Sequence, residues 1–318
     1  MTKIKDLKVS DRLKQNLLVK SCVNGVSPMG SPYLNLVLQD DTGMLDGKFW
    51  NVKPADIEAV VAGEVQFVSF EVLDYNHQLQ LRVNKIERID QSEIDMRDYV
   101  MSSVYSKEEL MQKMNELIDS IQNPNYKTIV NAMLDRIHDD FYNYPAASRI
   151  HHNYMGGLAE HTIGMAKLAN DVCDIYPMLD RDLLLSGVIV HDMGKVAELG
   201  GLISGEYTLA AKLVGHISIG QGWLMEVSKE LGLEDQEEAI LLRHMVLAHH
   251  GKMEYGSPIL PKVPEAEALS LIDNMDARMN TLAQAFENVE PGQWTSRIFA
   301  LENRQFYKSN YAHNKKEE

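Results

Sequence analysis

Hydrophobic and polar residues alternate along the first 90 residues of the chain. Leu34, Leu36 and Leu38 recur at every second position, so they occupy one face of an extended strand. Four further segments rich in Val, Leu, Phe and Tyr are separated by turn-forming residues such as Asn24-Gly25. The five expected strands are Gln15–Val23, Pro32–Leu38, Leu45–Trp50, Val65–Val72 and Gln78–Ile86.

A short helical segment, residues 54–61, separates the third expected strand from the fourth. Five strands with one helix at that point match the order of a five-stranded OB β-barrel. We therefore predict an OB domain over residues 1–90. Barrels of this kind bind single-stranded nucleic acids across their second and third strands.

After residue 105 the spacing of hydrophobic residues becomes helical. Ser106 and Glu109 have the spacing of a capping box, and Leu110 and Met114 follow at helical intervals. Pro124 marks the start of a second helix, because its missing N–H costs nothing there. Further helices are expected at Leu158–Ile175, Arg181–His191, Leu209–Leu231, Asp235–His250 and Glu265–Glu287.

These elements predict a multidomain fold that combines α and β structure. The N-terminal five-stranded OB β-barrel is followed by an all-α helical bundle over residues 106–310. The polar residues 91–105 are expected to form a linker, and residues 311–318 a frayed tail.

The only two cysteines, Cys22 and Cys173, lie far apart in the sequence, which favours a protein of a reducing compartment. The formal net charge of the 318 residues is −15, which argues against tight, non-specific binding to duplex nucleic acid. The OB segment is nearly neutral, and bound divalent ions would locally reverse the sign in the acidic helical part. The first residues lack the apolar run of a signal peptide, and no segment approaches the ~20 apolar residues of a membrane span. We expect a cytoplasmic protein without a membrane partner.

Histidines and aspartates near the ends of predicted helices carry the clearest chemical signal. Imidazole and carboxylate are the ligands that divalent ions such as Zn²⁺, Mn²⁺, Fe²⁺ and Co²⁺ accept, and an aspartate directly after a ligand histidine can bridge two ions. This pattern predicts a metallophosphohydrolase site. The candidate ligands are His161, His191, Asp192, His216, His249, His250 and Asp273.

His250 is the open case among these ligands. Adjacent residues on an α-helix diverge by about 100°, so His249 and His250 reach the same ion only if their helix ends there. Gly251 is placed to end it.

The predicted barrel also carries candidates for nucleic-acid contact. Aromatic rings stack on bases, while Lys and Arg neutralise the backbone. A ring at the end of a half-buried strand can equally belong to the core, and both interpretations stay open for Phe49 and Trp50. The candidates are Tyr33, Lys48, Phe49, Trp50 and Arg82.

Several segments of the chain resemble a known family. HDMGK at 191–195 and HISIG at 216–220 resemble the HD-superfamily phosphohydrolases, although the GYP element of their HD-GYP branch is absent. The OB segment and three longer stretches resemble the YhaM-type 3′-to-5′ exoribonucleases over nearly the whole chain. These stretches are YPAASRIHHNYMGGLAEHT at 144–162, HHGKMEYGSPILP at 249–261 and WTSRIFALENRQFYK at 294–308.

The resemblance implies two divalent ions, with Mn²⁺ foremost and Co²⁺, Fe²⁺ and Zn²⁺ as alternatives. Asp276 would support the ligands rather than bind an ion. One ion would be held by His161, His191, Asp192 and Asp273, and the other by Asp192, His216, His249 and His250.

The same resemblance assigns roles in catalysis. Asp192 and Lys195 are the expected catalytic residues, with Lys195 neutralising charge on the phosphate; a solvated surface lysine is the alternative. His152 is an expected substrate-binding residue.

Three functions remain compatible with the sequence. The leading one is a metal-dependent 3′-to-5′ exoribonuclease on single-stranded RNA, with single-stranded DNA as a further substrate candidate. The others are a phosphodiesterase of a small nucleotide with a regulatory OB domain, and a single-strand binding protein whose HD domain is structural. Homo-oligomerisation stays open. RNA and DNA are not separated, because recognition of the 2′-hydroxyl depends on a few contacts without a sequence signature.

Overall fold

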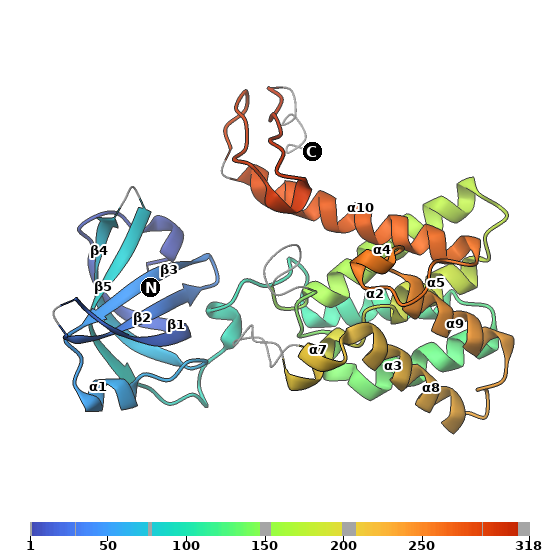
Figure 1. Ribbon diagram of the computed structural model, residues 1–318, viewed down its shortest axis with the longest axis horizontal. Helices are drawn as coiled ribbons and strands as arrows, with labels where there is room; N and C mark the ends of the chain where they lie inside the picture. Colours follow the sequence, from blue (N-terminus) through green and yellow to red (C-terminus); the bar gives the residue numbers. More distant parts are fainter. Residues whose placement is uncertain are drawn as a thin grey trace. The chain divides into compact units, whose positions relative to one another are not determined.

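The structure, a computed structural model, describes residues 2–28, 30–75, 78–146, 154–198, 208–287 and 289–310. It divides into two compact units, and the boundary falls between Val104 and Tyr105. The first unit contains the strands and the second the long helices (Figure 1).

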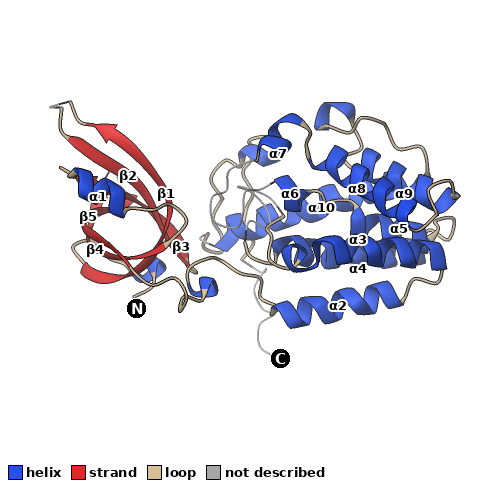
Figure 2. Ribbon diagram, turned by 90° about the horizontal axis from the view of Figure 1, so that it is seen from below, coloured by secondary structure: helices blue, strands red, loops and turns tan. Residues whose placement is uncertain are grey.

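The strands of the first unit close into a barrel (Figure 2). Around the barrel they follow the order β1, β2, β3, β5, β4, and β3 pairs with β5 in parallel while the other neighbours are antiparallel. This is an OB fold, and it confirms the five expected strands and the helix between the third and fourth. The elements are β1 Arg12–Val26, β2 Pro32–Asp40, β3 Gly43–Trp50, α1 Pro54–Ala59, β4 Val65–Tyr75 and β5 Gln78–Arg88.

The alternation along β3 corrects one sequence prediction. Gly47 and Phe49 are buried, whereas Trp50 is exposed. Phe49 is only 7% exposed and belongs to the barrel core with Leu34 and Leu36. The prediction that Phe49 contacts substrate is therefore wrong, because a ring enclosed by aliphatic side chains cannot stack on a base.

The second unit is a helical bundle, as the sequence predicted. The capping box of Ser106 and Glu109 begins its first helix, and Pro124 begins the second. Within the described residues, no helix combines the length and apolar character needed to cross a membrane. The helices are α2 Lys107–Asp119, α3 Pro124–Phe141, α4 Gly157–Ile175, α5 Arg181–Val190, α6 Lys195–Glu198, α7 Leu209–Leu213, α8 His216–Glu230, α9 Glu237–Ala248 and α10 Pro264–Glu287.

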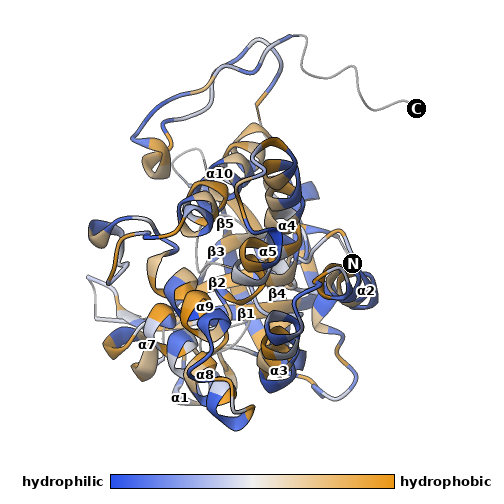
Figure 3. Ribbon diagram, turned by 90° about the vertical axis from the view of Figure 1, so that its right-hand side faces the viewer, coloured by the Kyte–Doolittle hydropathy of each residue, from blue (hydrophilic) through white to orange (hydrophobic). Residues whose placement is uncertain are grey.

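Helix α5 lies at the centre of this bundle. Every residue from Leu183 to Val190 is buried, and α5 packs against α3, α4, α9 and α10; Figure 3 shows α5 among α4, α9 and α10. An apolar run without a polar face can be stable only when neighbours cover it on all sides. The run therefore carries the residues at its C-terminal end into the interior of the unit.

Residues 209–231 were expected to form one helix, and that expectation is wrong. The structure has two helices, α7 and α8, separated at Val214 and Gly215. Gly215 has φ +77°, a left-handed conformation that glycine adopts without a steric penalty. His216 consequently becomes the first residue of α8 instead of lying within a longer helix.

Two segments outside the main helices are more ordered than the sequence predicted: the expected linker before the bundle and the segment after α10. The expected linker, residues 91–105, contains a 3₁₀ turn at Met96–Asp98 and the buried residues Tyr99 and Val100. After α10, residues 289–310 fold back on themselves through two antiparallel bridges, which join Trp294 with Tyr307 and Ile298 with Arg304. The expected frayed tail, residues 311–318, lies outside the described residues.

The turn after α5 approaches α8 backbone to backbone. A Cβ atom at Gly194 would lie 2.1 Å from the carbonyl oxygen of His216 and 2.9 Å from the amide nitrogen of Gly220. Both neighbours are backbone atoms, so they cannot rotate away. Glycine at position 194 therefore fixes the distance between the His191-Asp192 turn and the start of α8.

Gly194→Ala should separate that turn from α8 and destabilise the helical unit. Overpacking of this kind costs about 1–3 kcal/mol, which urea unfolding would detect as a lower free energy of unfolding. Gly222→Ala is the matched control, because no atom lies within 4 Å of its Cβ position. Alanine there should leave stability unchanged or raise it by up to about 1 kcal/mol. Equal stability of the two variants would contradict the close-packing argument.

Candidate metal centre

Seven candidate ligands from five separate helices converge inside the helical unit. His161 lies on α4, His216 begins α8 and Asp273 lies on α10. His191 and His249 are the C-cap residues of α5 and α9, with Asp192 and His250 directly after them. The ligand atoms form two groups whose members lie within 4.8 Å of one another: His161, His191 and Asp273 in the first, and His216, His249 and His250 in the second.

Asp192 joins the two groups. Its Oδ2 atom lies 3.1 Å from Nε2 of His191 and 3.9 Å from Nε2 of His161. Its Oδ1 atom lies 3.6 Å from Nε2 of both His216 and His249. One carboxylate oxygen therefore faces each group, which is the arrangement that a bridging carboxylate needs.

Hydrogen bonds at Nδ1 fix the orientation of the imidazole rings. A carbonyl oxygen can only accept, so Nδ1 of such a ring donates its proton and Nε2 keeps a lone pair for a cation. The ring orientations are therefore set before any ion binds. The Nδ1 hydrogen-bond partners are Asp276 for His161 (2.6 Å), the Val188 carbonyl for His191 (2.7 Å), the Val246 carbonyl for His249 (2.7 Å) and the Tyr255 carbonyl for His250 (2.7 Å). Nδ1 of His216 lies 3.2 Å from Oε2 of Glu198.

The interior of the centre contains polar atoms without hydrogen-bond partners. Among the described residues, these include Nε2 of His191, His216 and His249 and Oδ1 of Asp192, all buried. Buried polar groups are normally hydrogen-bonded, because leaving one unsatisfied is destabilising. Lone pairs that point at one another across a buried space are satisfied by a cation, so the residues present fit divalent metal ions.

Charge also favours a cation at Asp192. Burial alone would raise the pKa of this carboxyl, but the positive charge of Lys195 and the nearby His191 hold it well below its usual range. Nζ of Lys195 lies 2.6 Å from Oδ2 of Asp192, and the lysine side chain is only 14% exposed. Lys195 is thus a buried member of the centre, and the alternative of a solvated surface lysine is wrong.

The histidines differ in the protons they hold. Burial lowers the pKa of His249 and of His250, so these rings are neutral, as metal ligation requires. At His161 burial also acts to lower the pKa, but Asp273 and Asp276 outweigh it and raise the pKa to about 9. Nε2 of His161 must therefore lose a proton when a cation binds.

His250 meets the condition that the sequence had left open. Helix α9 ends at Ala248, and a ligand atom of His250 lies within 4.8 Å of ligand atoms of both His249 and His216. The amide nitrogen of His250 donates to Oγ of Ser257 at 3.1 Å. Its ring centroid lies 4.2 Å from that of His249 and 5.3 Å from that of His216.

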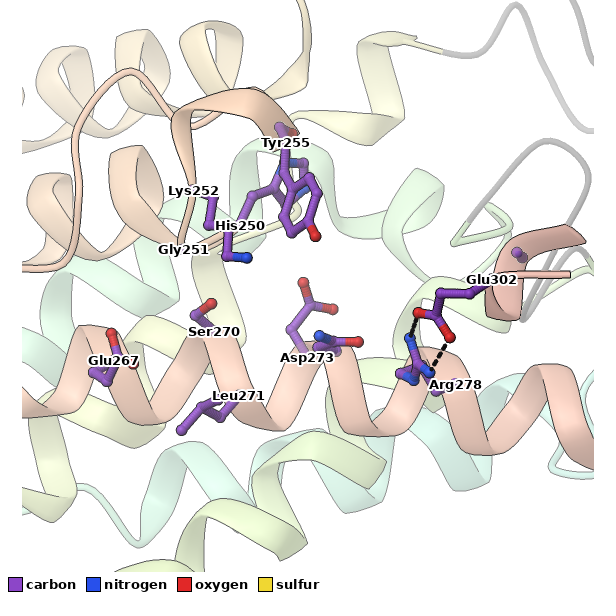
Figure 4. Close-up of a pocket in the computed structure, with 12 residues that line it drawn as sticks. His250, Gly251, Lys252, Tyr255, Glu267, Ser270, Leu271, Asp273, Arg278 and Glu302 are labelled. Atoms are coloured by element: carbon purple, nitrogen blue, oxygen red, sulfur yellow. Dashed lines mark hydrogen bonds and ion pairs between the residues drawn. The ribbon is translucent and has the colours of Figure 1, made fainter. Parts of the chain in front are cut away.

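A cavity of about 490 Å³ borders the centre (Figure 4). His250 and Asp273 line it, and so do Tyr255, Arg278 and Glu302. Neither Glu198 nor the last three residues stood out in the sequence, because their roles depend on contacts between distant segments rather than on a local pattern.

Apart from the buried Phe49, the candidates in the barrel are at least partly exposed. The rings of Tyr33 and Trp50 are 4.6 Å apart, and Nζ of Lys48 lies 5.2 Å from the centre of the Tyr33 ring. Trp50 is 45% exposed, unlike the buried Phe49. Arg82 is exposed but forms an ion pair with Glu71. His152 lies outside the described residues.

The closed OB barrel and the buried histidine-aspartate centre define an OB-fold protein with an HD-type, metal-dependent phosphohydrolase domain. A family model described as HD domain matches residues 158–278, and one described as putative helicase matches residues 96–181. The second OB-fold domain of replication protein A from Methanococcus maripaludis, a solved structure, covers 29% of this chain and 98% of its own, with 28% identity and a TM-score of 0.24.

A curated relative covers almost the whole chain. The 3′-5′ exoribonuclease YhaM of Geobacillus sp. (strain WCH70) is 42% identical over 301 residues, which are 94% of this chain and 93% of the relative. The chain therefore belongs to the YhaM family of 3′-5′ exoribonucleases.

Replacing His191 and Asp192 together by alanine should remove bound metal and abolish phosphodiester hydrolysis. Asp192 faces both groups of ligands, so its loss leaves each group without one of its ligands. Elemental analysis would measure metal per chain, and circular dichroism would confirm that the helices remain. His138→Ala, on α3 and outside the centre, is the control and should keep its metal. Near-normal metal content and turnover in the double variant would refute this metal centre.

Proposed function

We propose that this protein removes nucleotides one at a time from the 3′ end of single-stranded RNA and releases nucleoside 5′-monophosphates. The observation that carries the proposal is Asp192, placed between two groups of metal-ligating side chains in an HD domain. The family membership agrees with this activity. Single-stranded DNA is a further substrate candidate, and the cytoplasmic location and the oligomeric state stay predictions.

The ligand set supports two ions, one for each group, with Asp192 shared. Divalent ions in such a site polarise phosphoryl oxygens and make water a stronger nucleophile near neutral pH. Mixed imidazole and carboxylate ligands suit Mn²⁺, and also Co²⁺, Fe²⁺ and Zn²⁺.

The chain's own residues orient the substrate and balance its charge. The hydrogen bonds at Nδ1 hold the rings in a fixed geometry, which limits reorganisation during the reaction. The Asp192 carboxylate keeps the pKa of Lys195 raised although burial opposes it, so the ammonium stays charged beside the phosphate position. We propose that Lys195 stabilises the negative charge that develops on the phosphate or on the leaving oxygen.

The OB barrel supplies a surface for the single strand upstream. The exposed ring of Trp50 lies against the partly buried ring of Tyr33, and Lys48 adds a positive charge beside them. Each base stacked on an aromatic ring contributes about 1–3 kcal/mol. This surface favours a polymer over a small nucleotide as the substrate.

The end of the RNA strand at which degradation begins tests the proposed reaction. With RNA labelled at its 5′ end, the protein and Mn²⁺ should give a ladder of shortening products and mononucleotides, because only the 3′ end enters the centre. A 3′-terminal hairpin should stop degradation. Internal fragments from a circular RNA would show cleavage within the strand and remove the exonuclease assignment.

Changes in β3 test the role of the barrel. Trp50→Ala should weaken binding of single-stranded RNA roughly 5- to 150-fold, the effect of losing one stack, with little change in stability. Phe49→Ala should instead destabilise the barrel by about 3–5 kcal/mol, since it empties a core position.

Met44→Ala is the matched control for Trp50→Ala, because Met44 lies on the same strand and is 44% exposed. Its RNA affinity, measured by fluorescence anisotropy, should equal that of the unchanged protein. If Trp50→Ala binds RNA as tightly as Met44→Ala does, this face of the barrel does not hold the strand.

A further inference from the structure

The cavity beside the metal centre has the size and position of a nucleotide site. Its volume of about 490 Å³ lies within the range of roughly 300–1,000 Å³ that is typical of small-molecule sites. It borders both groups of metal ligands, through His250 and Asp273. Helix α10, the 3₁₀ turn Met253–Tyr255 and the segment 289–310 form its walls (Figure 4).

We propose that this cavity receives the 3′-terminal nucleotide of the substrate, and that Glu302 accepts a hydrogen bond from its free 3′-hydroxyl. The inference rests on the proposed exoribonuclease function. It assigns the residue that recognises the end of the strand.

Two arginines hold the carboxylate of Glu302 at the rim of the cavity. Arg278 donates from Nη1 to Oε1 at 2.8 Å and from Nη2 to Oε2 at 3.0 Å, and Nη2 of Arg304 lies 2.6 Å from Oε2. A carboxylate offers about four lone-pair sites, so these three contacts leave one acceptor site. The Glu302 side chain is 61% exposed, and a hydroxyl of a ligand can reach it.

The backbone at this position is also held in an unusual conformation. Glu302 has φ +53° and Asn303 has φ +57°, and few residues other than glycine adopt the left-handed region. Such conformations are destabilising and persist where surrounding contacts enforce them, often at ligand-binding sites. The two arginines supply those contacts, so Glu302 is fixed rather than free to turn away.

The negative charge of Glu302 distinguishes a strand that ends in a 3′-hydroxyl from one that ends in a 3′-phosphate. Its hydrogen bonds with Arg278 lower the pKa of Glu302 to about 2, so the group is an ionised carboxylate at neutral pH and can only accept. A 3′-hydroxyl can donate to it. A 3′-phosphate presents acceptors and negative charge, and is therefore repelled.

The spacing along α10 suits a nucleotide that lies along the helix. Asp273 and Arg278 are five residues apart, about 7.5 Å along the axis, which is comparable with the length of one sugar–phosphate unit. A phosphate at the metal centre would thus bring the 3′-hydroxyl of the same nucleotide close to Glu302.

Tyr255 provides a surface for the base of that nucleotide. Figure 4 shows it across the cavity from α10, and its ring is exposed. Its carbonyl oxygen accepts from Nδ1 of His250 at 2.7 Å, which fixes the backbone of Tyr255 relative to a candidate metal ligand. Nζ of Lys252 lies 5.2 Å from the ring centre.

Preference between strand ends tests the role of Glu302. The values of kcat/KM would be measured with Mn²⁺ on two RNA oligomers that differ only in a 3′-hydroxyl or a 3′-phosphate. The unchanged protein should prefer the hydroxyl. In Glu302→Gln that preference should fall by roughly tenfold or more, the size expected for one charge-assisted hydrogen bond, because Arg278 and Arg304 are then free to bind the phosphate.

Glu226→Gln is the matched control. It removes a glutamate that pairs with Arg136 at 2.6 Å in the same unit but away from the cavity, and it should keep the preference of the unchanged protein. If Glu302→Gln lowers kcat/KM equally for both oligomers, Glu302 only supports the structure and the proposal is overturned. If the unchanged protein hydrolyses neither oligomer, the exoribonuclease function fails instead.

Binding gives a second readout that does not depend on turnover. With Mn²⁺ present, adenosine 5′-monophosphate should bind the unchanged protein more tightly than adenosine 3′,5′-bisphosphate, and Glu302→Gln should remove or reverse this difference in calorimetry. Tyr255→Ala should weaken both ligands, whereas Tyr255→Phe should keep their affinity because the ring remains. If Tyr255→Ala binds both ligands as tightly as the unchanged protein does, the proposed stacking of the base on Tyr255 is wrong.

Discussion

The metal centre depends on the contacts that the buried carboxylate of Asp192 makes with the surrounding imidazole groups and with Lys195. A buried charge is strongly destabilising unless other charges or hydrogen bonds compensate it. Here Nζ of Lys195 lies 2.6 Å away, and four histidine Nε2 atoms lie within 3.9 Å. The apolar run of α5 carries Asp192 to this position, and the contact of Gly194 with α8 sets the distance to the second group of ligands.

This constraint links stability to function. Side chains whose lone pairs converge on a buried space repel one another or lack hydrogen-bond partners until a cation binds. Binding of the ion therefore stabilises the folded unit. The hydrogen bonds at Nδ1 keep the rings from turning to find other partners. A site held so firmly can place a phosphate with the accuracy that hydrolysis requires.

Local pattern predicted most of the fold, and the candidate ligands that it indicated lie together in the structure. Alternation gave the barrel strands, and helix ends gave the positions of His191, Asp192 and His249. The assignment of Phe49 failed because alternation shows which residues share a face but not which face is buried. The break at Gly215 lay inside an apolar helical pattern, where a single glycine is tolerated and does not by itself mark a helix end. Glu302 did not stand out in the sequence, since its position beside the cavity is set by an ion pair with Arg278, 24 residues away.

A crystal soaked in Mn²⁺ and measured near the manganese absorption edge tests the central claim most directly. Two anomalous peaks about 3.5–4 Å apart should appear, one within bonding distance of His161, His191 and Asp273 and the other of His216, His249 and His250, with Asp192 bound to both. A single peak, or peaks that Asp192 does not touch, would contradict the bridged centre.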